Sequence, residues 1–294
     1  MTTGEKIKKL RTDKMMTQSE LVGNHITRNM LSRIESDEAN PSLGTLLFLA
    51  SRLGVPAGYL LADENEDKVY AKSFVVEDIK RAFRLGNYAI CRQLCLESEF
   101  VDDEILMLSA ESCFAVAVEA FDKGSLKAAV SYFDEAISFA DKTSYYSEHI
   151  KAASYMYLRY MQKFSPNLAS VYEEEETLEH FCAMSNNFCR YMYALECVEN
   201  SHMSFASSYI KKGDREDPTV LHLGAKIDMY NGNYRLALIK LQQILTNDRE
   251  VSRPLLYEVL VSLEECAKIT DDFRSAYEYA TTKMDVLQKM LADE

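Results

Sequence analysis

A six-residue pattern recurs along most of the chain and constrains its fold more than any other feature. Each copy starts at a turn residue, places an aromatic residue or Leu two positions later, and has Ala or Cys three positions after that. The four clear copies are GNYAIC (86–91), GSLKAA (124–129), GNYRLA (232–237) and DDFRSA (271–276). They start 38, 108 and 39 residues apart, and the long interval fits three units of about 36 residues with turns near Pro166 and Ser201. Such a period indicates stacked pairs of helices.

This pattern resembles the tetratricopeptide repeat, from about Tyr70 to the C-terminus. In such a repeat the small residue lets the second helix approach the first closely, and the aromatic side chain fills the space at their elbow. No unit buries its core alone, so the units stack into a right-handed superhelix. The resemblance implies about six helix pairs in this chain. A generic helical bundle stays open as the alternative.

The composition favours helix throughout the chain. Only five prolines and ten glycines occur in 294 residues, and alternating runs of β-branched residues are nearly absent. We therefore expect an all-α fold. The polar, acidic stretch ADENEDK (62–68) is the best domain boundary. It divides the chain into an N-terminal domain (1–63), a linker (64–69) and a repeat domain (70–294).

The N-terminal domain shows the signals of five short helices around one core. Thr17 and Glu20 have the spacing of a capping box, and Thr27 offers a second N-cap closely after it. A preceding helix is expected at Gly4–Asp13, a following one at Leu43–Leu53, and a short fifth one at 59–61. The apolar residues predicted to build this core are Ile7, Leu10, Leu21, Leu31, Ile34, Leu43, Leu46, Leu47, Ala50 and Leu53.

Taken together, LRTDKMMTQSEL, SRIES and NPSLGTLLFLASRLGVP resemble the Xre-type helix-turn-helix of phage repressors. The sequence departs from that pattern by having one residue fewer between TQ and RIE, where GNHIT replaces the usual turn. A turn shortened in this way is similar to that of the Rgg/PlcR/PrgX regulators, which join tetratricopeptide repeats to the same DNA-binding module. Both halves of the chain therefore resemble one family of transcription regulators of the quorum-sensing type.

The resemblance implies that the helix after Thr27 enters the major groove of DNA. Arg28 and Asn29 are then base-reading residues, because Arg can contact guanine, and Asn adenine, through two hydrogen bonds each. Ser32 and Arg33 lie one turn further on, facing the bases or the backbone. Polar residues near helix starts are expected at phosphates, where they fix the register of the protein on DNA. These backbone-contacting residues are Thr17, Gln18, Asn40 and Ser42.

Arg11 and Glu35 match a structural ion pair of the resembling repressors. In those proteins an Arg at the end of the first helix pairs with the Glu that closes the recognition helix. The resemblance therefore implies that Arg11 and Glu35 hold these two helices together, and that removal of one partner would leave an unpaired charge.

Charge is distributed unevenly along the chain. The residues through Asp63 include eight basic and seven acidic ones, a net charge of +1. Because the whole chain has a net charge of −13, the residues after Asp63 carry −14. Only the first segment can approach a polyanion without strong repulsion. Double-stranded DNA is its expected partner. A homodimer is expected too, because one short recognition helix reads few base pairs.

The repeat family binds ligands on the concave face, which is lined by the first helix of each pair, and the resemblance implies a short signalling peptide as the ligand. Lysines recur at the inward positions, where positive charges suit carboxylates of a peptide and aromatic rings suit its apolar side chains. The open alternative is that these lysines only offset the acidic walls. The predicted groove residues are Lys80, Phe83, Phe114, Phe121, Tyr160, Lys163, Tyr191, His222, Lys226, Glu265 and Lys268.

Two other classes of function stay open. The first is a DNA-binding regulator whose repeats only dimerise it or bind another protein. The second is a cytosolic adaptor in which the helix-turn-helix serves protein contact. An enzyme is disfavoured, because the five histidines are scattered and neither a Ser/His/Asp set nor a glycine-rich phosphate loop occurs.

No cofactor, metal site or membrane contact is expected from the sequence. The seven cysteines form no CxxC motif, so we expect them to behave as buried apolar residues in a reducing compartment. No run approaches the roughly 18 apolar residues of a membrane span, and the charged N-terminus does not read as a secretory signal. The expected location is cytoplasmic.

Overall fold

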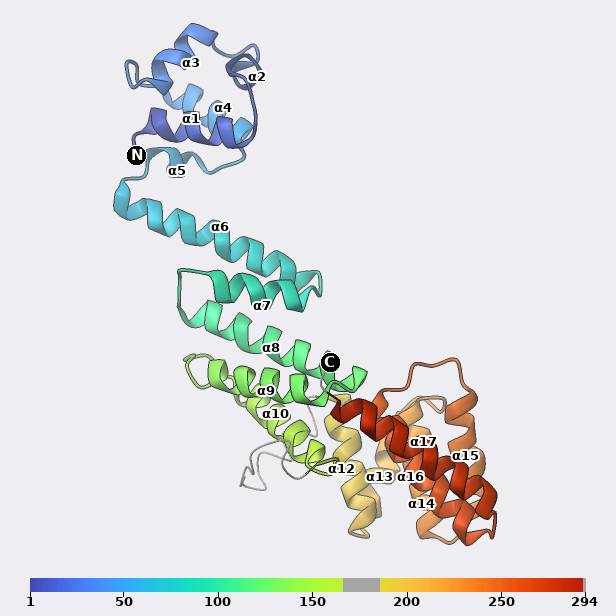
Figure 1. Cartoon of the computed structure of the whole chain (residues 1–294). Coiled ribbons are helices and arrows are strands. Elements are labelled where there is room, and N and C mark those ends of the chain that lie inside the picture. Colours follow the sequence, from blue (N-terminus) through green and yellow to red (C-terminus); the bar gives the residue numbers. More distant parts are fainter. Residues whose placement is uncertain (166–185, 293–294) are drawn as a thin grey trace. The chain divides into compact units, whose positions relative to one another are not determined.

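The computed structural model describes residues 1–165 and 186–292, which form sixteen helices and no strand. The expected all-α fold is confirmed. The chain divides into two compact units, Met1–Asp78 and Ile79–Glu294, whose elements are labelled in Figure 1. The predicted linker of residues 64–69 is instead the start of a long helix, α6 (Glu64–Arg84), which contains the boundary between the units. Acidic residues favour the first turn of a helix, so an acidic stretch starts a helix as readily as it forms a linker.

Five short helices build the N-terminal unit before α6. They are α1 (Thr3–Asp13), α2 (Gln18–Val22), α3 (Arg28–Glu35), α4 (Leu43–Leu53) and α5 (Ala57–Leu61). The predicted core is largely confirmed, with Leu10 only partly buried. The prediction that Leu43 and Leu47 belong to the core is wrong, because 69% and 52% of their surface is exposed. Leu49, which was not predicted, is buried instead, because only one side of α4 faces the core.

Close contacts at the N-terminus of α1 fix this unit. A Cβ atom on Gly4 would lie 2.0 Å from the carbonyl oxygen of Ile34, so α1 reaches the end of α3 only because this residue is glycine. Lys6 is almost fully buried, and its Nζ donates to the carbonyl oxygens of Tyr59 at 3.1 Å and Ala62 at 2.6 Å. A buried ammonium is tolerated here because it satisfies carbonyls at the C-terminal end of α5.

The second unit consists of helices that follow one another as antiparallel pairs (Figure 1). After the last part of α6 come α7 (Tyr88–Glu97), α8 (Asp103–Lys123), α9 (Leu126–Ala140), α10 (Glu148–Met161), α12 (Asn187–Glu199), α13 (Met203–Lys212), α14 (Pro218–Tyr230), α15 (Tyr234–Thr246), α16 (Arg253–Ile269) and α17 (Phe273–Leu291). Five of the six expected pairs lie in the described residues. The turn predicted near Pro166, with the helix after it, falls outside them.

The repeated sequence pattern marks the turn within each described pair. Five turn residues have a positive φ, namely Gly86, Gly124, Ser201, Gly232 and Asp271. The predicted turn near Ser201 is thereby confirmed. The small residue five positions after each turn is buried, as expected for close packing of the two helices; these residues are Cys91, Ala129, Ala206, Ala237 and Ala276.

The repeat unit curls until helices far apart in the sequence touch. Helix α8 packs against α16, and α9 against α17. A Cβ on Gly124 would meet the side chain of Arg253 at 2.6 Å and that of Met290 at 3.0 Å, so this approach also depends on a glycine. A large hydrophobic cluster runs from Ala117 to Met290, and a smaller one lies around Cys113 and Ile150.

Six of the seven cysteines lie in the described residues, and all six are buried, as predicted. Cys182 falls outside these residues. In the same part of the chain, no helix combines the length and the apolar character needed to cross a membrane.

Candidate functional site

Two capped helices carry the candidate site of the N-terminal unit. The Thr17 hydroxyl accepts a hydrogen bond from the Glu20 amide, and the Glu20 carboxylate accepts one from the Thr17 amide at 2.7 Å. This is the predicted capping box. Thr27 caps α3 by accepting from the Met30 amide at 3.2 Å. Both starts are therefore fixed locally, and the turn between α2 and α3 holds them in one arrangement.

Helix α3 separates its side chains into two faces. Leu31, Ile34 and Glu35 are buried against the rest of the unit. The predicted base-reading residues are all exposed and lie on the opposite side; they are Arg28, Asn29, Ser32 and Arg33. The sequence positions i, i+1, i+4 and i+5 place these four on one face of a helix. Polar side chains are thus presented to solvent by a helix whose other face is anchored.

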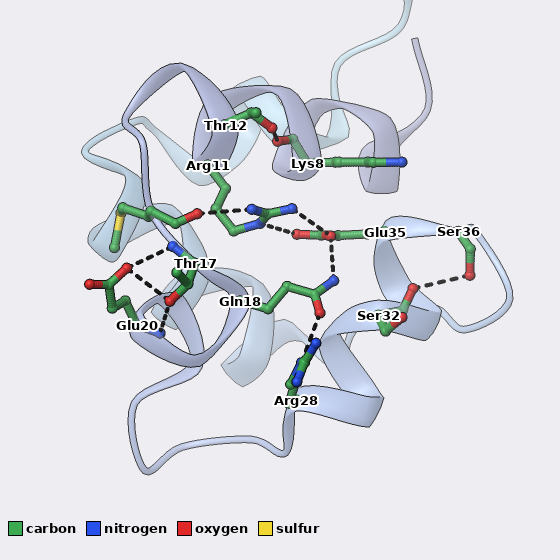
Figure 2. Close-up of polar contacts among 11 residues, drawn as sticks. Lys8, Arg11, Thr12, Thr17, Gln18, Glu20, Arg28, Ser32, Glu35 and Ser36 are labelled. Carbon is green, nitrogen blue, oxygen red and sulfur yellow. Dashed lines mark hydrogen bonds and ion pairs between the residues drawn. The ribbon is translucent and has the colours of Figure 1, made fainter.

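A chain of polar contacts links α1 to the start of α3 (Figure 2). Arg11 donates to both oxygens of Glu35, from Nε at 2.7 Å and from Nη2 at 3.1 Å, and its Nη1 donates to the Met16 carbonyl at 2.8 Å. Gln18 donates from Nε2 to Glu35 Oε2 at 2.8 Å and accepts at Oε1 from Arg28 Nε at 3.3 Å. Arg28 is therefore held on its helix by a relay of side chains that starts in the core.

The electrostatics of this relay are those of a partly buried ion pair. The side chains of Arg11 and Glu35 expose only 14% and 4% of their surface. The hydrogen bond with Glu35 raises the pKa of Arg11 above its usual value, although burial opposes the shift. Arg11 and Glu35 form the ion pair that the resemblance implied. Because Glu35 is almost fully buried, it does not contact a partner directly.

The residues predicted at the DNA backbone are mostly exposed. Thr17, Asn40 and Ser42 are exposed, and Gln18 is half-buried. Ser42 caps α4 by accepting from the Thr45 amide at 3.2 Å. Nothing in the sequence predicted that Gln18 bridges Glu35 and Arg28. The spacing of the Thr17–Glu20 capping box does not indicate this contact, because the contact depends on how α2 packs against α3.

The concave face of the repeat unit differs from the expected open groove. Phe121, Tyr191 and His222 are fully buried, so the prediction that they line an exposed groove is wrong. The reason is the tight curl of the unit, which brings α16 onto the first helices of earlier pairs. The Tyr160 hydroxyl donates to Glu258 at 3.2 Å, and the rings of Phe164 and Tyr257 lie 5.2 Å apart.

The remaining predicted groove residues fall into separate places. Lys80 pairs with Glu104 at 2.6 Å, and Lys268 pairs with Glu264 at 2.5 Å. These ion pairs agree with the alternative in which the lysines only offset neighbouring acidic residues. Phe83, Phe114 and Lys226 are half-buried, whereas Glu265 and Lys163 are exposed. Only Tyr160 and Lys163 of the predicted set share one described pocket.

That pocket lies between α10 and α12 and has a volume of about 120 Å³. Its lining mixes both charge signs with two methionines; the residues are Met156, Arg159, Tyr160, Lys163, Met192, Glu196 and Glu199. Arg159 and Glu196 pair across it at 3.4 Å. A lining of this kind suits a ligand with both charged and apolar groups.

A buried polar network joins α12, α14 and α16. Tyr191 Oη is 2.7 Å from His222 Nδ1, and His222 Nε2 is 3.1 Å from Ser262 Oγ. Burial, with a contribution from the nearby Lys226, lowers the pKa of His222 to about 3. Burial also raises the pKa of Glu258. The imidazole is therefore neutral, with hydrogen-bonding partners at both nitrogens.

Comparison with known proteins identifies the N-terminal part. A helix-turn-helix family model matches residues 7–60. The immunity repressor protein of Bacillus phage phi105 is 37% identical over 65 residues, which make up 22% of this chain and 45% of that protein. The match thus spans less than half of the length of this curated relative.

Solved structures with similar chains cover nearly the whole length. Bacillus thuringiensis PlcR, in complex with the peptide PapR7 and DNA, is 17% identical with a TM-score of 0.27, and 99% of each chain is covered. ComR from S. thermophilus, in complex with DNA and its signalling peptide ComS, is 15% identical with a TM-score of 0.29, covering 97% of this chain and 99% of that one. The family match, the capped helices and the two faces of α3 agree on one point: residues 7–60 are similar to a helix-turn-helix domain.

Proposed function

We propose that the protein is a sequence-specific DNA-binding transcription regulator and that α3 is its recognition helix. The observation that carries this proposal is the exposed face of α3, where Arg28, Asn29, Ser32 and Arg33 stand together on a helix anchored by Glu35. A helix-turn-helix places such a face in the major groove. The relay through Gln18 holds Arg28 in advance, which reduces the entropy lost when it contacts a base.

The experiment starts by selecting the preferred site of the full chain from random duplex DNA. Binding of that site and of mismatched sites is then measured by fluorescence anisotropy. Arg28→Ala or Asn29→Ala should cost about 1–3 kcal/mol for the selected site and relax the preference at one base pair. Arg235→Ala, an exposed arginine of α15, is the matched control and should leave binding unchanged. Equal affinity and selectivity in the α3 variants would refute the assignment.

We also infer that the repeat unit binds a small ligand, a short peptide in the first instance, and that binding alters the DNA affinity of the protein. The pocket between α10 and α12 supports this, because it offers opposite charges and methionine side chains within one site. Binding at Lys163 and Lys226 would further favour acidic or C-terminal carboxylate groups. If the repeats serve only dimerisation or protein contact, no such ligand exists.

Native mass spectrometry of protein purified from its host tests this inference directly, since a bound peptide adds its mass to the chain. The identified peptide is then titrated by calorimetry into the double variant Lys163→Glu and Lys226→Glu, which should lose most of its affinity. Lys211→Glu with Lys212→Glu, at the exposed end of α13, is the control with the same change of charge. Undiminished affinity in the first variant would exclude this face as the site.

A further inference from the structure

The pocket between α10 and α12 has an apolar floor and a charged mouth. Met156, Tyr160 and Met192 expose only 5%, 5% and 7% of their surface, so they form its floor. Lys163 and Glu199 also line it but are exposed, so they lie at its mouth. The volume of about 120 Å³ suits one medium-sized apolar side chain, since an apolar cavity of about 150 Å³ takes up benzene. Methionine side chains adapt their shape to such a group.

The two charges at the mouth differ from the other charges of the lining. Arg159 and Glu196 pair with one another at 3.4 Å. Within the described part of the chain, neither Lys163 nor Glu199 has an ion-pair partner. The Nζ atom of Lys163 lies 5.3 Å from the centre of the Tyr160 ring, and this cation–π contact holds it beside the floor of the pocket. One positive and one negative group are therefore left for a ligand.

Both charges act on the same half-buried carboxyl group. Burial raises the pKa of Glu258, the nearby Lys163 opposes this shift, and the nearby Glu199 adds to it. The two charges therefore face the same interior, one from the end of α10 and the other from the end of α12. A ligand that joins them carries a carboxylate and an ammonium close together. An α-amino acid carries both on one carbon atom, whereas a peptide carries its terminal charges at opposite ends.

We propose that this pocket binds a free α-amino acid with an apolar side chain of about the size of that of leucine. Its carboxylate pairs with Lys163, its ammonium pairs with Glu199, and its side chain lies between Met156 and Met192. A ligand of about nine non-hydrogen atoms is expected to bind with a Kd between roughly 10 µM and 1 mM. Because the pocket also supports the proposed peptide, the amino acid competes with it. That competition rests on the proposed function, but the binding of the amino acid does not.

Ligand-observed NMR titrations of the full chain test each part of the ligand. L-leucine should bind. Isocaproate, which lacks the ammonium, and isopentylamine, which lacks the carboxylate, should each bind at least tenfold more weakly, because a charge-assisted hydrogen bond is lost. Free glycine keeps both charges but should also bind at least tenfold more weakly, because it leaves the apolar floor unfilled.

Two variants that each remove one charge assign the roles. Glu199→Gln should weaken L-leucine at least tenfold and leave isocaproate unchanged, because isocaproate has no ammonium. Lys163→Gln should weaken L-leucine to a similar extent and leave isopentylamine unchanged. Lys212→Gln and Glu278→Gln, at exposed positions of α13 and α17, are the matched controls and should bind L-leucine as the wild type does. Circular dichroism should show unchanged helicity, because all four positions are exposed.

Three results would overturn the amino-acid site. They are no binding of L-leucine to the wild type at about 10 mM, equal binding of isocaproate and L-leucine, and an equal loss of both probes in Glu199→Gln. Binding of the peptide without binding of L-leucine would also overturn this site and leave the proposed function intact. Binding of L-leucine that depends on both charges, in a chain purified without a peptide, would support the site and overturn the proposed peptide.

Discussion

The exposed face of α3 and the concave face of the repeat unit were both predicted to meet a partner, but the four predicted residues of α3 are all open and those of the concave face are open only in part. On α3, polar side chains stand in solvent while a relay from Arg11 through Glu35 and Gln18 supports them from behind. On the concave face, predicted contact residues such as Tyr191 and His222 are buried against other first helices. A local pattern decides which side chains are exposed on the short helix α3, whereas in a curled array contacts across many units decide it.

The largest effect is expected where the N-terminal face depends on a buried charge. Glu35→Ala removes the carboxylate that accepts from Gln18 and pairs with Arg11, which keeps its bond to the Met16 carbonyl, and should lower the stability of the N-terminal unit by about 2–4 kcal/mol. Hydrogen exchange of the full chain should show lost protection in α1–α3 and little change in α14–α17. Glu38→Ala removes an exposed carboxylate whose pairing distance to Arg33 is 3.9 Å, so it should be nearly neutral. Equal protection in both variants would show that the relay is not needed.

A steric test addresses the same support from the backbone side. Gly4→Ala places a methyl group against the Ile34 carbonyl and should destabilise the N-terminal unit by about 1–3 kcal/mol. Gly44→Ala is the matched control in α4, where the nearest atom to a new Cβ is 4.0 Å away. That change should be neutral or slightly stabilising because alanine favours helix. Thermal denaturation of the two variants compares them, and a reversed order would contradict the close approach of α1 to α3.

These particulars show what the sequence could and could not predict. The caps Thr17 and Thr27, the pair of Arg11 with Glu35, and the turns at Gly86, Gly124, Ser201, Gly232 and Asp271 depend on short-range spacing or on a motif, and the structure contains them. Leu43 and Leu47 were misplaced, because the width of the buried stripe on α4 depends on its neighbours.

The prediction of an open groove was wrong for a related reason. Tyr191 and His222 were predicted at inward-facing positions of an open groove. They are buried instead, because the array curls tightly. That curl depends on contacts such as Gly124 with Arg253, which are 129 residues apart in the sequence and leave no periodic signal. The repeat pattern therefore predicts helices and turns better than it predicts the free surface.

A pH titration sharpens the contrast, because the buried histidine makes the repeat unit sensitive to acid. The pKa of His222 falls from an ordinary 6.5 to about 3 in the folded chain. Between these values the unfolded chain binds a proton that the folded chain excludes, so stability from this group falls as pH falls. The loss approaches about 1.4 kcal/mol per pH unit below 6.5.

The substitution His222→Gln isolates this contribution. The raised pKa of Glu258 acts in the opposite direction, since the folded chain then holds a proton that the unfolded chain releases above its ordinary 4.5. Tyr191 stays neutral across the range, because burial raises its pKa well above the ordinary value. The difference in unfolding free energy between wild type and variant, from denaturant titrations at several pH values, should therefore change steadily between pH 6.5 and 4. A constant difference would show that His222 is accessible to protons in the folded chain.

The smallest expected effect tests the closure of the concave face itself. Tyr160→Phe removes the hydroxyl that donates to Glu258 and keeps the ring that packs on Phe164. Glu258 is half-buried, and burial raises its pKa, so the loss of one donor should cost about 1 kcal/mol. Because the bond joins α10 to α16, hydrogen exchange should quicken in both helices together, although 98 residues separate the partners. Tyr145→Phe, at a position with 53% exposure, is the control and should change neither helix. If exchange quickens in α10 alone, the two ends of the array are held by their apolar contacts, and the hydroxyl serves only its own helix.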